Sequence, residues 1–471
     1  MKNWNVKKTI VPRDEMPEHH RLQQSLHWGH LIALGVGAIV GTGILTLIGV
    51  GAAKAGPAVM LSFAIAGAIC ACAALAYAEV ATMIPASGSA YTYSYVVFGE
   101  LIAWIIGWSL ILEYSLVVSA VAVGWSGYAS PLLGISTALS NGPELGGIAN
   151  FPAVLIISIV AGLLIFGTKE SATVNAILVV IKMLALVMFI VIALSVFNSA
   201  NFDPFMPMGF SKQSVPSPDG TTVEVGVMAA AAIIFFAFYG FDAIATASEE
   251  TKNPDRDLAI GIVGSMVVCV IIYMAVAAAA IGAVPTTVFA DSPEPLALIL
   301  RGINHPVAAK LLALSAALAL PTVILAFFFG QSRIFLAMAR DGLLPERLAH
   351  VSKRGSPVRV TIFTAVVVSV IAAIFPLSEI AALANAGTLT AFIAVCAAMI
   401  TMRRREPDAP RKFRAPAGMT VGVLGILGCL YLMFSLPTKT QEYFLFWNLF
   451  GVVVYWFYGS PRAAKARAAR G

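Results

Sequence analysis

Long apolar segments alternate with short polar loops along almost the whole 471-residue chain. A transmembrane helix requires about 20 consecutive, mostly apolar residues. The loops between the apolar segments are polar and rich in Pro, Gly or Asn, as in "SNGPELGGIAN" and "EETKNPDRD". The pattern predicts an all-α integral membrane protein with twelve spans, at residues 30–53, 57–83, 98–128, 151–167, 174–197, 226–247, 259–283, 306–339, 358–375, 380–401, 418–436 and 442–459.

Composition supports a membrane protein without a large soluble domain. Hydrophobic residues make up 59% of the chain and charged residues only 11%, whereas a soluble domain carries about 25% charged residues. The net charge of +6 is spread over loops and tails, which argues against a nucleic-acid partner and is explained by membrane lipids. The five cysteines lie in apolar runs, so we expect neither disulfides nor a metal site.

The distribution of Lys and Arg predicts the orientation. With the N-terminus inside, most basic residues fall in inner loops and tails, so the positive-inside rule places both termini in the cytoplasm of a cell-membrane protein. Spans 1–5 then end outside, and span 6 runs antiparallel to span 1. The predicted organisation is a cytoplasmic tail, two repeats of five helices, two extra helices and a basic cytoplasmic tail, at residues 1–29, 30–197, 226–401, 402–459 and 460–471.

Spans 1 and 6 each contain a glycine interruption near the middle. Span 1 carries Gly41-Thr42-Gly43, and span 6 carries "FAFYGFDA" around Gly240. Paired interruptions in antiparallel helices of two halves point to an inverted-repeat transporter, because unwound backbone persists in a membrane only where it lines a cavity or meets a ligand. The simpler alternative is that Gly37 and Gly41 form a small-residue contact for helix packing.

Two half-helices that meet at such interruptions suit a zwitterion. The half-helix N-terminus after Thr42 carries a partial positive charge and favours a carboxylate. The half-helix C-terminus before Gly240 offers carbonyl groups that can accept from an ammonium. Together the two half-helices predict a receptor for a zwitterion.

Six motifs carry a resemblance to a known family: "GVGAIVGTGI", "AYAEVATMIPASGSAYTYSYVVFGE", "GWSLILEY", "FFAFYGFDAIATASEE", "NPDRD" and "GQSRIFLAMARDGLLP". The chain resembles the amino acid–polyamine–organocation superfamily from about residue 25 to 458, and within it the bacterial members of the cationic amino acid transporter family. The resemblance implies a leucine-transporter-type fold, in which a five-plus-five inverted repeat with broken helices 1 and 6 is followed by two extra helices.

The resemblance also implies a substrate site. The carboxylate would meet the backbone of the span 1 break, at Gly41, Thr42 and Gly43, with Ile39 beside them. The ammonium would meet backbone carbonyls of the span 6 break, at Phe236, Ala237 and Tyr239. Many bacterial members couple amino acid uptake to protons, so the resemblance implies protons as the coupling ion and no other cofactor.

Lys182, in "VVIKMLALVMFIV" of span 5, is the first candidate for proton coupling. An ionisable residue inside the membrane is a functional candidate by default because its burial is costly. Sodium-coupled proteins of this fold hold a cation close to helix 5, and the resemblance implies that the Lys182 ammonium replaces it. The alternative is a lysine whose side chain extends to the inner membrane surface.

Other acidic residues have less specific assignments. Glu113 of span 3 could relay protons, line the pore or pair with a polar neighbour, whereas Asp242 could cap the second half-helix first and serve coupling second. Glu79 is expected at the inner interface. Charged residues near span 6 and span 8 predict an inner gate, or a solvated loop, at Glu249, Glu250, Lys252, Arg256, Asp257, Arg333 and Arg340.

The substrate pocket is expected to be short. Helix 8 of the family closes the side-chain pocket, and here it reads "VILAFFFGQSR", with Phe327 as the candidate that limits its length and Phe236 and Phe241 adding aromatic bulk. This favours small neutral L-amino acids such as alanine, taken up with protons. An amino acid exchanger, a cationic amino acid permease and a non-transporting sensor are the alternatives; no enzyme motif is present, and the oligomeric state is left open.

Overall fold

The computed structural model describes residues 6–8, 26–84, 88–166, 172–216, 222–248, 251–290, 292–345 and 358–470. The first half contains α1 (Trp28–Ile39), α2 (Thr42–Leu45), α3 (Leu47–Ala55), η3 (Gly56–Ala58), α4 (Val59–Met83), α5 (Ser89–Val97), α6 (Glu100–Leu133), α7 (Thr137–Ser140), η4 (Pro143–Leu145), α8 (Phe151–Phe166), α9 (Ala172–Leu194) and η5 (Ser199–Phe202). A two-stranded antiparallel hairpin of β1 (Gln213–Pro216) and β2 (Thr222–Val225) follows.

The second half is also helical. It contains α10 (Val227–Ile234), η6 (Phe235–Ala237), α11 (Asp242–Thr246), α12 (Pro254–Ala283), α13 (Thr286–Phe289), α14 (Pro295–Gly302), α15 (Pro306–Arg340), α16 (Val358–Ile374), α17 (Leu377–Arg405), α18 (Gly418–Ser435), α19 (Thr438–Val454) and α20 (Ser460–Arg470), with a π-helical turn at Tyr455–Gly459 between the last two.

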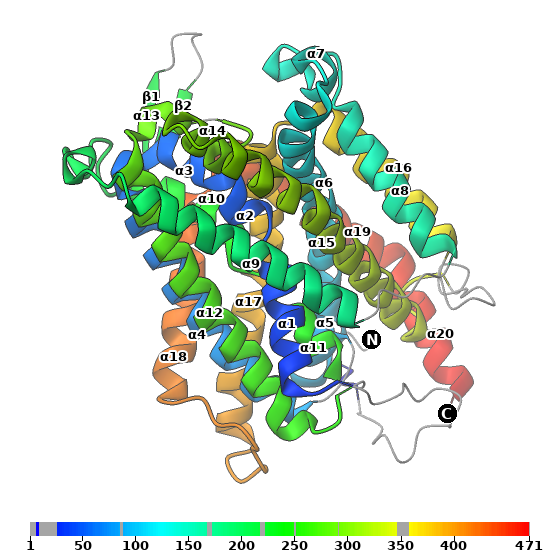
Figure 1. Ribbon diagram of the computed structural model, residues 1–471. Coiled ribbons are helices and arrows are strands. Elements are labelled where there is room, and N and C mark those ends of the chain that lie inside the picture. The colour runs from blue at the N-terminus through cyan, green and yellow to red at the C-terminus, as the bar shows by residue number, and fades with distance from the viewer. Residues whose placement is uncertain are drawn as a thin grey trace.

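The helices form one bundle with two distinct ends (Figure 1). The N-terminal end of α1 and the C-terminal α20 lie at one end, here called the terminus face. The hairpin and the short helices α7, α13 and α14 lie at the other end, here called the hairpin face.

Eight helical segments of the described chain are long and apolar enough to cross a membrane. They are Leu47–Met83, Glu100–Leu133, Val174–Leu194, Val227–Ala245, Pro254–Ala283, Pro306–Arg340, Leu377–Arg405 and Gly418–Ser435. Three shorter apolar helices are Trp28–Ile39, Phe151–Ile165 and Val358–Ile374. The chain is therefore a multi-pass helical membrane protein. These segments do not reproduce the twelve predicted spans one for one. Span 1 is divided and its second part runs on into span 2, and α19, at predicted span 12, is not among the apolar helices of either group.

The outer surface of the bundle is suited to lipid. Phe363 on α16 is 66% exposed, and Phe446 on α19 is 68% exposed. Side chains of this size are rarely left so open in contiguous patches in water. The inner helices α4, α6, α12, α15 and α17 pack against one another and bury the aromatic core, which includes Trp104, Tyr77 and Tyr273.

Both predicted interruptions are present, with one shift in position. The first lies at Val40 and Gly41, between α1 and α2, so Thr42 and Gly43 form the first turn of a helix rather than an unwound segment. The second lies at residues 238–241, between η6 and α11.

Candidate functional site

The two interruptions lie against each other in the middle of the bundle. A Cβ atom added to Gly43 would come within 2.3 Å of the Cα atom of Ala237, and one added to Gly240 would come within 3.0 Å of the carbonyl carbon of Ala38. Glycine is therefore required at both positions because the two backbones touch. The structure thus brings together the seven residues predicted from the two interruptions: Ile39, Gly41, Thr42, Gly43, Phe236, Ala237 and Tyr239.

The first interruption leaves backbone amide donors without helical acceptors. Gly41 precedes α2 with φ −150° and ψ −143°, and the first amides of a helix have no intrahelical acceptors. A Cβ atom added to Gly41 would lie 3.6 Å from its nearest neighbour, Val323 of α15, so this glycine has room beside it. The Thr42 hydroxyl is buried without a partner in the described chain. These groups can accept an anionic ligand.

The second interruption is held open by side chains from other helices. Gly240 has φ +117°, a conformation that side chains other than glycine rarely adopt. Asn385 of α17 donates its amide to the carbonyls of Ala232 and Ile233, at 2.7 and 3.0 Å. The carbonyls of Phe236 and Ala237 lie at the end of η6, where helical donors run out.

Asp242 stabilises the second interruption in a way that differs from the prediction. Helix α11 begins at Asp242 itself, so Phe241 occupies the N-cap position that the sequence assigned to the aspartate. The Asp242 carboxylate instead accepts from the backbone amide of Gly240 at 3.1 Å and from the Tyr114 hydroxyl at 3.0 Å. Asp242 thus links α6 to the interruption.

Lys182 reaches the first interruption from α9. Its Nζ atom donates to the carbonyl of Gly37 at 2.5 Å and to the carbonyl of Val40 at 2.7 Å, and the residue is only 4% exposed. The alternative of a side chain extended to the membrane surface is therefore wrong. The ammonium occupies the place where the last carbonyls of α1 would otherwise lack donors.

Glu113 lies buried on α6 with both carboxylate oxygens lacking a hydrogen-bond donor in the described chain. A Cβ atom added to Gly387 of α17 would come within 3.0 Å of the Glu113 Cβ atom, which shows how closely the two helices meet there. Glu113 is close enough to Asp242 for electrostatic interaction. An ionised carboxylate without partners is costly to bury, so this group is suited to carry a proton.

Aromatic rings border the two interruptions. The Phe327 ring of α15 lies 5.3 Å from the Tyr114 ring and 6.5 Å from the Tyr239 ring, measured between centroids. Phe236 packs edge-on to Tyr239 at 5.0 Å. The side chain of Phe329, the last phenylalanine of "AFFFGQSR", lies outside the described residues.

Phe241 belongs to the packing of the bundle. Its ring contacts those of Tyr77 on α4 and Phe392 on α17, at 5.6 and 5.2 Å.

Sequence reasoning missed three side chains that bind backbone carbonyls of the helix segments next to the interruptions. Besides Asn385, the Tyr273 hydroxyl donates to the carbonyl of Ile39 at 2.9 Å, and the Tyr128 hydroxyl donates to the carbonyl of Leu45 at 2.5 Å. An asparagine in an apolar span is a detectable signal of such a role. The two tyrosines carry no comparable signal.

The terminus face is closed by contacts with the N-terminal segment. Lys8 pairs with Asp341 at 2.9 Å, and the Tyr91 hydroxyl donates to the same carboxylate at 2.8 Å. The backbone amide of Lys252 donates to the carbonyl of Leu26 at 2.9 Å. Glu249 and Glu250 of the predicted inner gate lie outside the described residues.

Glu79, which was expected at the inner interface, lies near the end of α4 and is buried there against neighbouring protein segments. It is 1% exposed, accepts from Arg403 at 2.8 and 2.5 Å and from the amide of Ala415 at 2.8 Å, and lies 3.3 Å from the Nε atom of Arg411. Arg403 at the end of α17 and Arg411 of the loop that follows neutralise the buried carboxylate.

Comparisons with known proteins agree with this architecture. A family model described as "Amino acid permease" matches residues 26–458. The chain is 42% identical to the branched-chain amino acid permease BcaP of Bacillus subtilis, with 93% of each chain covered. It is 37% identical to the methylthioribose transporter of the same organism, with 96% of this chain and 97% of the relative covered.

A more distant match is the vacuolar cationic amino acid transporter 2 of Arabidopsis thaliana, which is 34% identical over 86% of this chain and 65% of the relative. The resemblance inferred from the six motifs is confirmed, since permeases and cationic amino acid transporters both match along most of the chain. These relatives are named as permeases or transporters, as expected for a protein that is not an enzyme. The chain therefore belongs to the amino acid permease family, within the amino acid–polyamine–organocation superfamily.

Proposed function

We propose that this protein takes up small neutral L-amino acids such as alanine together with protons, by alternating access. The observation that carries the proposal is the contact of the Lys182 ammonium with the carbonyls of Gly37 and Val40, at the end of α1. Because the titratable Lys182 side chain is hydrogen-bonded to the backbone beside the substrate site, its protonation state can change the shape of that site.

The coupling follows from the strength of the two hydrogen bonds. A charged donor makes hydrogen bonds roughly twice as strong as a neutral one. Loss of the Lys182 proton therefore weakens the attachment of α9 to the end of α1 and favours states in which the two separate. Glu113 and Asp242 are also buried, and Asp242 accepts from the backbone of the second interruption. These two carboxylates are the candidates for the next group that carries the proton.

We assign recognition of the substrate's carboxylate and ammonium to backbone groups of the protein. Recognition of the substrate's side chain is assigned to apolar side chains. The amides of α2 take the carboxylate, and the carbonyls beyond α10 take the ammonium. Phe327 limits the room for the side chain. The name of the branched-chain amino acid permease relative favours a second candidate substrate class, the branched-chain amino acids, which the same apolar walls would suit.

The proposed topology has twelve spans, with two inverted repeats of five helices and two extra helices, in the cell membrane. The two facing interruptions support it, because inverted repeats place broken helices opposite each other at mid-membrane. Both termini are proposed to be cytoplasmic, since the terminus face carries the basic loop after α17 and the basic helix α20.

The test is uptake of a panel of radiolabelled amino acids into proteoliposomes, with and without an imposed pH gradient. We expect alanine to accumulate when the outside is acidic, and arginine to be excluded. Accumulation of leucine in preference to alanine would favour the branched-chain class. Exchange of internal for external amino acid without any response to the gradient would favour an exchanger, uptake of arginine would favour a cationic permease, and binding without any flux would favour a sensor.

A further inference from the structure

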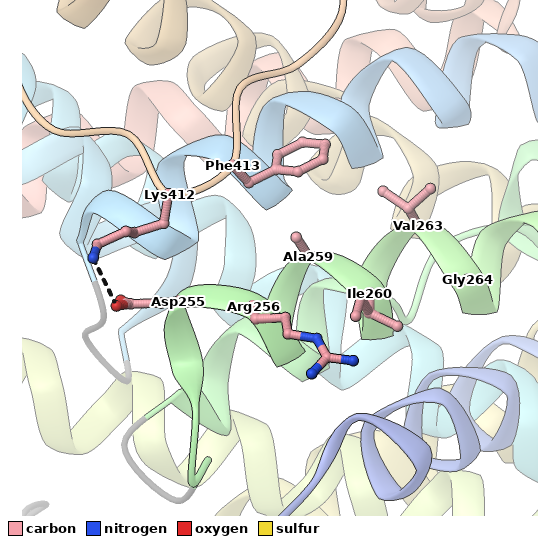
Figure 2. A pocket seen from close by; sticks show the side chains of 8 residues that line it. All are labelled: Asp255, Arg256, Ala259, Ile260, Val263, Gly264, Lys412 and Phe413. Carbon is pink, nitrogen blue, oxygen red and sulfur yellow. Dashed lines mark ion pairs between the residues drawn. The ribbon is translucent and has the colours of Figure 1, made fainter.

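A groove of about 460 Å³ lies on the surface of the bundle at the first turns of α12, near the terminus face. Helix α12 forms its floor, and Lys412 and Phe413, from the loop after α17, cover one side (Figure 2). This groove is separate from the interruptions of α1 and α10. The residues assigned to the substrate site and to proton coupling do not line it, whereas Arg256, which the sequence predicted for an inner gate or a solvated loop, does.

The groove has one charged end and one apolar end. Its α12 residues are Arg256, Ala259, Ile260, Val263 and Gly264, which follow the i, i+3, i+4, i+7, i+8 spacing of a single helix face. Arg256 is exposed at the start of this face, and the four apolar residues continue it toward the middle of the membrane.

The cations at the charged end are only weakly neutralised. No carboxylate in the described chain lies within ion-pair distance of the Arg256 side chain. Lys412 pairs with Asp255 at 3.4 Å, but both side chains are more than half exposed, at 59% and 58%. Such a surface pair contributes little and leaves the cation available for another anion. Asp257, the other acid of this turn, is buried away from the groove.

We propose that this groove binds an anionic phospholipid, with the headgroup phosphate between Arg256 and Lys412 and an acyl chain along Ala259, Ile260, Val263 and Gly264. A free phosphate would use the cations and leave the apolar face uncovered, whereas a phospholipid matches both ends. The groove lies at the cytoplasmic leaflet if the orientation proposed above is right. Basic residues at that leaflet attract anionic lipids.

The site borders a helix of the transport machinery. A Cβ atom added to Gly264 would lie 3.1 Å from the Cδ1 atom of Ile32, so α1 packs against α12 beside the apolar end of the groove. A lipid bound in the groove would therefore lie next to the half-helix that ends at the first interruption.

The test is native mass spectrometry of the full-length protein in detergent, titrated with phosphatidylglycerol or with zwitterionic phosphatidylcholine. We expect phosphatidylglycerol to bind preferentially. The double variant Arg256→Gln/Lys412→Gln should lose about 30-fold in affinity for it, since each basic group near a surface contributes about fivefold. The variant Val263→Trp, which fills the apolar end and keeps both charges, should also lose the bound lipid.

Lys310→Gln provides the matched control. Lys310 is exposed beside a second groove, near the hairpin face, which is lined by Trp125, Leu311 and Leu314 among others. This substitution should leave phosphatidylglycerol binding unchanged.

Three results would overturn the proposal. One is unchanged lipid affinity in the double variant or in Val263→Trp, and another is an equal loss in Lys310→Gln, which would indicate non-specific attraction. The third is binding of inorganic phosphate with the same affinity as phosphatidylglycerol, which would indicate an ion site without an acyl chain. The measurement needs no transport, so its outcome is independent of the proposed uptake activity.

Discussion

Two replacements of Lys182 distinguish the two roles of its ammonium, which are to hold the end of α1 and to carry the coupled proton. Lys182→Ala removes both hydrogen bonds to the end of α1, whereas Lys182→Arg keeps a cation in place that does not release its proton in proteins. We expect both variants to lose gradient-driven accumulation. The amino acid itself should still bind, because its charged ends meet the backbone of the two interruptions.

The magnitude follows from the two contacts and from the proton gradient. A hydrogen bond from a charged donor contributes about 1.5–3 kcal/mol, so loss of both bonds in Lys182→Ala should weaken the attachment of α9 to α1 by about 3–6 kcal/mol and leave the Gly37 and Val40 carbonyls without this donor. One pH unit is worth about 1.4 kcal/mol per proton. Coupling to one proton therefore allows about tenfold accumulation per pH unit, which both variants should reduce to none.

The assay is alanine uptake into proteoliposomes at fixed internal pH while the outside is made acidic. Exchange of internal for external alanine, measured without a gradient, reports whether each variant is folded and binds substrate. Lys310→Gln, which alters an exposed lysine, should accumulate alanine like the parent. If Lys182→Ala concentrates alanine under the gradient as the parent does, Lys182 is not the coupling group and Glu113 becomes the leading carrier.

Four further substitutions test the site and its support. Gly43→Ala should destabilise the protein because its Cβ atom would meet the Ala237 backbone, whereas Gly41→Ala should fold and bind substrate more weakly; thermal melting and binding distinguish the two effects. Phe327→Ser should admit longer side chains, measured as leucine or methionine uptake relative to alanine, and an unchanged substrate range would show that another residue sets the limit. Glu79→Gln should lower stability by about 3–5 kcal/mol by leaving buried arginines unpaired, and unfolding at the same temperature as the parent would contradict this.

The membrane class, the two interruptions and the family were predictable from the sequence. Each depends on local properties: apolar length determines whether a segment can enter lipid, and glycine at Gly41 and Gly240 marks where a helix can stop. The superfamily was identified from six motifs spread along the chain. Each motif is a continuous stretch of sequence, so it can be recognised without knowing which helices touch.

Only the tertiary structure decided which way the buried polar side chains point. The membrane helices are apolar on nearly all sides, so their sequences do not indicate which face meets the bundle and which meets lipid. This is why the sequence left open whether Lys182 extends to the surface, and why it did not indicate the partners of Glu79 and Asn385. Each of these side chains finds its partners on a helix distant in the sequence, and that pairing is set by how the helices pack.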